Sequence, residues 1–154
     1  MARTSMEIQQ DITRWSNILN ENSSSAGSYA SECTELQERI SSLTQRRQAL
    51  YDTYTELGMM CGTLTAAVGL VQESCVMNTE GKTYLADQIG QYKSRTEGII
   101  NTAAGVLDFQ LKLLKKSFST ASENAQSASG KADTARQKLL ELKKELAEAA
   151  DTEG

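Results

Sequence analysis

Apolar residues recur along the first half of the chain at alternating steps of four and three residues, from Ile8 to Cys75. This heptad spacing places them on one narrow stripe of an α-helix, which has to be buried against another helix. The stripe consists of Ile8, Ile12, Trp15, Leu19, Asn22, Ala26, Tyr29, Cys33, Leu36, Ile40, Leu43, Arg47, Leu50, Tyr54, Leu57, Cys61, Leu64, Val68, Val71 and Cys75. The pattern predicts one long helical arm over about residues 5–76.

The second half of the chain carries a matching stripe. Its members are Ile100, Ala104, Leu107, Leu111, Leu114, Phe118, Ala121, Ala125, Ala128, Ala132, Ala135, Leu139, Leu142, Leu146 and Ala149. Between the two stripes, Asn78, Thr79 and Gly81 form the strongest turn signal, and Thr79 is a candidate N-cap. We therefore expect a turn at about residues 77–82 and a second arm over about residues 83–150.

Folding the chain back at this turn brings the two stripes face to face. Leu57 then lies opposite Ile100, and the small residues of 22–36 lie opposite the alanine-rich segment 121–135. The predicted fold is all-α, a long antiparallel, coiled-coil-like helical hairpin forming a single domain over residues 1–154. Serine and glycine are poor residues for a helix interior, so each arm is either continuous or broken near residues 23–28 and 127–130, which would give four helices.

Two polar residues lie within the stripe of the first arm. Asn22 is expected to fix the register of the two arms, as polar residues do in coiled-coil seams. Arg47 either extends past the core to solvent or reaches a carboxylate of a partner protein.

The composition narrows the classes of function. The chain has no proline, only 5% aromatic residues and a net charge of −4. No run of basic residues suggests a nucleic-acid surface, and there is no histidine to act as a general base. Cys33, Cys61 and Cys75 are separated by whole heptads and are expected to be small core residues. We therefore predict no enzyme activity, no metal site and no cofactor.

The part of the hairpin nearest the turn has apolar residues beyond the stripe. Residues 57–72 carry no charge, and neither do residues 98–107 across the hairpin. Such a surface is expected to be covered by another protein, by a second copy, or by a membrane surface, although the run is too short to span a membrane. The candidate binding residues are Leu57, Met59, Met60, Leu64, Val68, Val71, Ile99 and Val106.

The chain resembles the small helical-hairpin proteins of type VII secretion, and most of all the YwqH-like helical partners of LXG-domain toxins, which are distant relatives of the WXG-type family. The resemblance is one of pattern over residues 30–120, carried by Leu36–Leu43, Tyr54–Leu57, Tyr92–Ile100 and Leu107–Leu114. The family's Trp-x-Gly turn corresponds to residues 79–81, where Gly81 is present, the tryptophan is not, and Tyr84 supplies the following aromatic ring.

This resemblance implies a non-enzymatic targeting partner that binds the helical N-terminal domain of an LXG-type toxin or a sister small helical protein. No Tyr or Phe is followed four residues later by an acidic residue, so the family's export signal is missing. No cleavable signal peptide is predicted. The expected location is the cytoplasm, or the exterior after export within a complex. The alternative function is a self-associating structural coiled coil, such as a homodimer.

Overall fold

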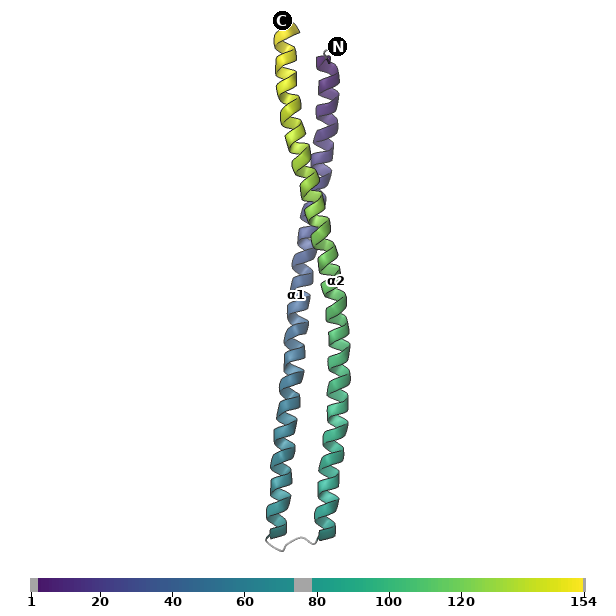
Figure 1. Ribbon diagram of the computed structural model, residues 1–154, viewed down its shortest axis with the longest axis vertical. Helices are drawn as coiled ribbons and strands as arrows, with labels where there is room; N and C mark the ends of the chain where they lie inside the picture. The colour runs from purple at the N-terminus through teal and green to yellow at the C-terminus, as the bar shows by residue number, and fades with distance from the viewer. Residues whose placement is uncertain (1–2, 74–78, 154) are drawn as a thin grey trace. The chain divides into compact units, whose positions relative to one another are not determined.

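The computed structural model describes residues 3–73 and 79–153, except for the side chains at 71–73, 79, 152 and 153. It contains two helices, α1 (Ser5–Glu73, 69 residues) and α2 (Thr79–Glu153, 75 residues), and no strand within these ranges (Figure 1). The predicted all-α helical hairpin is therefore confirmed.

The hairpin divides into two compact units, to which both helices contribute. We call Met1–Glu38 with Lys115–Gly154 the terminal unit, and Arg39–Leu114 the central unit. Within the terminal unit the helices are antiparallel, since Arg3 Nη1 donates to Glu145 Oε2 at 3.3 Å. In the central unit, Leu57 and Ile100 belong to one buried cluster, as the predicted register requires.

The first turn of α1 is closed by a reciprocal pair of hydrogen bonds. The backbone N–H of Thr4 donates to Glu7 Oε2 at 2.9 Å, and the backbone N–H of Glu7 donates to Thr4 Oγ1 at 3.3 Å. This is a capping box, which satisfies backbone donors that the helix itself leaves unpaired. The bonds from the backbone and hydroxyl of Thr4 hold the pKa of Glu7 below its usual value.

The predicted stripes form the contact between the helices. All fifteen stripe residues of α2 are buried or half-buried. On α1 the same holds for the described side chains except Arg47, Tyr54 and Leu64, which are exposed. All three lie in the central unit, where the core formed by two helices alone is thin.

Both helices run without interruption through residues 23–28 and 127–130, so the alternative of four helices is wrong. In the terminal unit Ala128, Ala132 and Ala135 are buried, and this packing outweighs the weak helix propensity of the nearby Ser and Gly residues. A Cβ atom added to Gly27 or Gly130 would meet nothing within 4 Å. These glycines therefore lower helix propensity without being required by a close contact.

Asn22 does not bond to the facing helix. Its Nδ2 donates to the carbonyl oxygen of Ile18, four residues back in the same helix, at 2.8 Å. This local bond uses one amide hydrogen of Asn22, as polar side chains within helices often do.

Residues 79–82, which were expected in the turn, are helical, because α2 begins at Thr79. Gly81 and Tyr84 lie in its first two turns, and Tyr84 is exposed. Asn78, Cys75 and the side chains of Val71 and Thr79 lie outside the part that the structure describes. Of the other cysteines, Cys61 is buried in the core and Cys33 is half-buried.

Candidate interaction surface

Large exposed hydrophobic side chains are concentrated in the central unit. Among the described side chains they are Tyr51, Tyr54, Met59, Met60, Leu64, Leu70, Tyr84, Tyr92, Ile99, Val106, Phe109 and Leu113. The terminal unit contributes only Met6 and Leu140 to this class within the described ranges. A surface so rich in apolar side chains is typical of an interaction site.

The structure divides the predicted binding residues into two groups. Met59, Met60, Leu64, Ile99 and Val106 are exposed. Leu57 is only 5% exposed and packs with Cys61 and Ile100 in the core between the helices, so it is not available to a partner in this conformation. Val68 is half-buried.

A second heptad row on α2 accounts for most of the exposed side chains there. Tyr92, Ile99, Val106 and Leu113 follow one another at intervals of seven residues and are all exposed. Residues seven apart lie on the same face of a helix, so these four side chains form one stripe separate from the buried seam. The sequence analysis named Ile99 and Val106 as candidate binding residues but not Tyr92 and Leu113. Their spacing of seven residues from Ile99 and Val106 was the signal that could have identified them.

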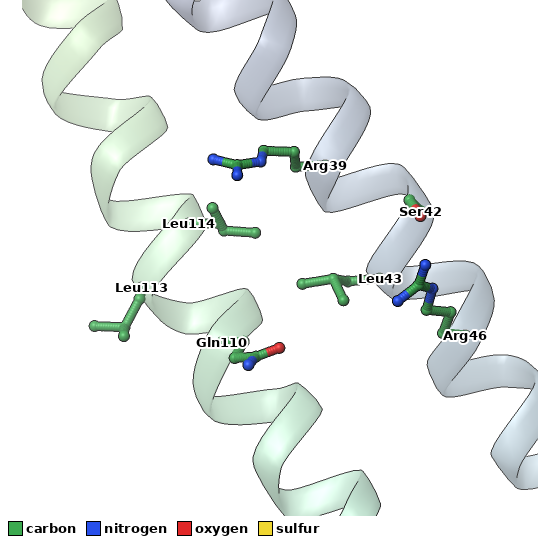
Figure 2. A pocket seen from close by; sticks show the side chains of 7 residues that line it. All are labelled: Arg39, Ser42, Leu43, Arg46, Gln110, Leu113 and Leu114. Carbon is green, nitrogen blue, oxygen red and sulfur yellow. The ribbon is translucent and has the colours of Figure 1, made fainter.

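The second row borders a groove between the two helices of the central unit. Arg39, Ser42, Leu43 and Arg46 of α1, together with Gln110, Leu113 and Leu114 of α2, line an open hollow of about 450 Å³. Figure 2 shows Leu43 and Leu114 extending from opposite helices into the space between them, and Arg39 extending from α1 toward α2. The groove therefore combines an apolar floor with a basic wall on α1.

Arg47, by contrast, is already paired within the chain. Its Nε lies 2.5 Å from Asp108 Oδ1, and its Nη2 lies 3.4 Å from Asp108 Oδ2. This hydrogen bond raises the pKa of Arg47 above its ordinary value. The Arg47 side chain extends out of the seam to a carboxylate on α2, and it lines a second hollow of about 220 Å³ with Tyr51, Tyr54 and Asn101.

Several threonines of the central unit use their hydroxyl groups within their own helix. Thr53 Oγ1 donates to the Ala49 carbonyl at 2.9 Å. Thr63 and Thr102 make the same type of bond, at 3.1 Å and 2.9 Å, to the carbonyl oxygens four residues back. The hydroxyl hydrogens of these threonines are therefore already used in hydrogen bonds within the chain.

None of the described polar or charged residues is buried. Across residues 3–73 and 79–153, no group of three or more His, Cys, Asp or Glu side chains could hold a metal ion. No helix in the searched ranges is long and apolar enough to cross a membrane. The features that the surface offers for binding are thus exposed apolar rows, a shallow groove and surface charges.

No protein-family model, curated protein or solved structure matches the chain.

Proposed function

We propose that this chain is a non-enzymatic helical partner protein, which binds a helical segment of another protein through the apolar surface of its central unit. The observation that supports this proposal is the unequal distribution of exposed hydrophobic side chains between the two units. The pattern resemblance to type VII secretion proteins leads us to propose an LXG-type toxin or a sister small helical protein as the partner. Binding would take place in the cytoplasm, with any export occurring as part of the complex.

The residues proposed to anchor the partner lie in the last turns of α1, within the central unit. Met59, Met60 and Leu64 are each exposed by about half or more. Covering the exposed part of such a side chain contributes about 1 kcal/mol, so the three together supply a substantial part of a micromolar affinity. Methionine side chains are flexible and adapt to irregular partner surfaces, which suits helix-in-groove recognition.

The test is affinity purification of the tagged protein from its native producer, followed by mass spectrometry of the proteins that co-elute. Met59→Lys and Leu140→Lys form a matched pair, because these side chains are 63% and 62% exposed but lie in different units. We expect the wild type and Leu140→Lys to retain one partner protein in stoichiometric amount, and Met59→Lys to lose it.

Circular dichroism provides the control, since both substitutions are at exposed positions and should leave helicity unchanged. A partner retained equally by both variants would contradict the assigned surface. Recovery of the chain alone from the native producer would contradict the partner function itself.

A further inference from the structure

The groove of the central unit belongs to a longer face, which can be followed by heptad spacing along both helices. On α1, Arg46 and Ser42 line the groove. Thr53 and Met60 continue the row of Arg46 at intervals of seven, and Ala49 and Glu56 continue the row of Ser42 in the same way. All of these side chains are exposed.

On α2 the same face is uncharged. Gln110 and Leu113 line the groove, and Ala103, Val106 and Ile99 continue their rows at intervals of seven residues. The α1 side of the face from residue 39 to 63 carries three charges, Arg39, Arg46 and Glu56. None of the three takes part in any ion pair among the described residues, in contrast to the neighbouring Arg47.

Arg46 and Glu56 are spaced so that a two-fold axis can pair them between two copies. An axis that brings Arg46 of one copy opposite Glu56 of a second copy also brings Arg39 opposite Thr63, Ala49 opposite Thr53 and Ser42 opposite Met60. The centre of this arrangement on α1 is at Tyr51.

The same axis can be followed onto α2. At the level of Val106 it brings Leu113 opposite Ile99, and Gln110 opposite Thr102. Leu57 packs against Ile100, so Tyr51 and Val106, each six residues away, lie at the same level of the hairpin. An axis fixed by the charges of α1 therefore crosses α2 at Val106.

We propose that this face binds a second copy of the chain, giving an antiparallel dimer of hairpins whose two-fold axis passes beside Val106. The α1 helices of the two copies pack against each other, and so do the α2 helices, as in an isologous four-helix arrangement. Each dimer gains two intermolecular Arg46–Glu56 ion pairs. This association goes beyond the proposed function, because it binds a second copy of the chain and not another protein. Met60 belongs to both surfaces, whereas Met59 lies on another face of α1.

The available area is sufficient for a dimer. Residues 39–63 extend for about 36 Å at 1.5 Å per residue, and two helices about 9 Å apart give a face about 18 Å wide. Each copy would cover about 650 Å², or about 1,300 Å² in total, which is within the range of specific interfaces.

Sedimentation velocity over a range of concentrations tests the association and its charge pairing. We expect reversible dimerisation of the wild type, at least about tenfold weaker in Arg46→Glu and in Glu56→Arg, and restored when both substitutions are combined. Lys112→Glu changes the net charge as much as Arg46→Glu does but is exposed away from this face, so it should leave dimerisation unchanged. A monomer at every concentration, or a double variant without rescue, would overturn the proposal.

A cysteine at the axis tests the register independently. In mild oxidant, Val106→Cys should form a covalent dimer, and peptide mapping should show a disulfide between the two substituted positions. Lys112→Cys should not form this link. A dimer in which position 106 forms no disulfide would exclude the proposed axis. Loss of the co-eluting partner protein in Met59→Lys tests only the partner function and not the dimer.

Discussion

Two leucines separated by one residue near the end of α2 provide a sharp test of the terminal core. Leu142 is 2% exposed and belongs to the predicted seam, whereas Leu140 is 62% exposed. Replacing either with alanine removes the same three carbon groups and changes helix propensity by the same small amount. Any difference in the free energy of unfolding between the two variants therefore comes from burial.

The expected magnitude for Leu142→Ala follows from the removed carbons. At about 0.8 kcal/mol for each buried group the transfer contribution is about 2.4 kcal/mol, and the cavity left between two helices adds to it. We expect a loss of about 3 kcal/mol for Leu142→Ala and a change within about 0.5 kcal/mol for Leu140→Ala.

Urea titration followed by the fluorescence of Trp15 measures this difference. Trp15 is the single tryptophan of the chain, and it is half-buried in the terminal unit together with Leu142. Its emission therefore reports on the unit that carries the substitution, while circular dichroism at 222 nm follows both units. Equal destabilisation by the two variants would refute the assignment of Leu142 to the seam.

Three further outcomes are expected. Gly130→Ala should raise the free energy of unfolding, measured by urea titration, by about 0.5–1 kcal/mol, because alanine has the higher helix propensity and its Cβ would meet nothing within 4 Å. Destabilisation would contradict the open space around Gly130. Thr4→Ala should make the stability of the fold depend less on pH in the acid range. Because the pKa of Glu7 is lowered in the folded state, Glu7 stabilises the fold above its usual pKa of about 4.5, and this contribution is lost as the pH falls through the lower folded value. The melting temperatures of wild type and variant should therefore converge in acid. A double-mutant cycle of Arg47→Ala and Asp108→Ala should show a favourable coupling that disappears at high salt, and a coupling that salt leaves unchanged would contradict an exposed ion pair.

The fold could be predicted from the sequence because one signal dominates it. The heptad seam determines which side chains are buried, and the registry of Leu57 with Ile100 follows once the turn is placed. The unbroken helices at residues 23–28 and 127–130 were harder to foresee. Intrinsic propensity favours breaks there, whereas the packing of small residues across the seam opposes them.

The interaction surface was predicted only in part, because α2 carries two adjacent rows of apolar residues between the turn and Val106. Leu85 and Ile89 are half-buried, and Ile89 packs against the cluster of Leu57 and Ile100, whereas Tyr92, Ile99 and Val106 are exposed. Periodicity alone cannot assign residues to one of two adjacent rows without knowing where the facing helix lies. The partner of Arg47 was missed for a similar reason, since Asp108 is next to the seam residue Leu107 and only the three-dimensional register shows which carboxylate is within reach.

The local hydrogen bonds of the threonines alter how their surface behaves toward an approaching helix. Burying a hydroxyl usually requires stripping water from it, with a penalty unless a new acceptor is found. Thr53, Thr63 and Thr102 already donate to carbonyl oxygens of their own helices, so docking against them removes little hydration. Toward an incoming helix they act much like valines, presenting a methyl group. The surface of the central unit is therefore more apolar toward a docking helix than its composition suggests. In the unfolded chain the same hydroxyl groups are free to bond to water.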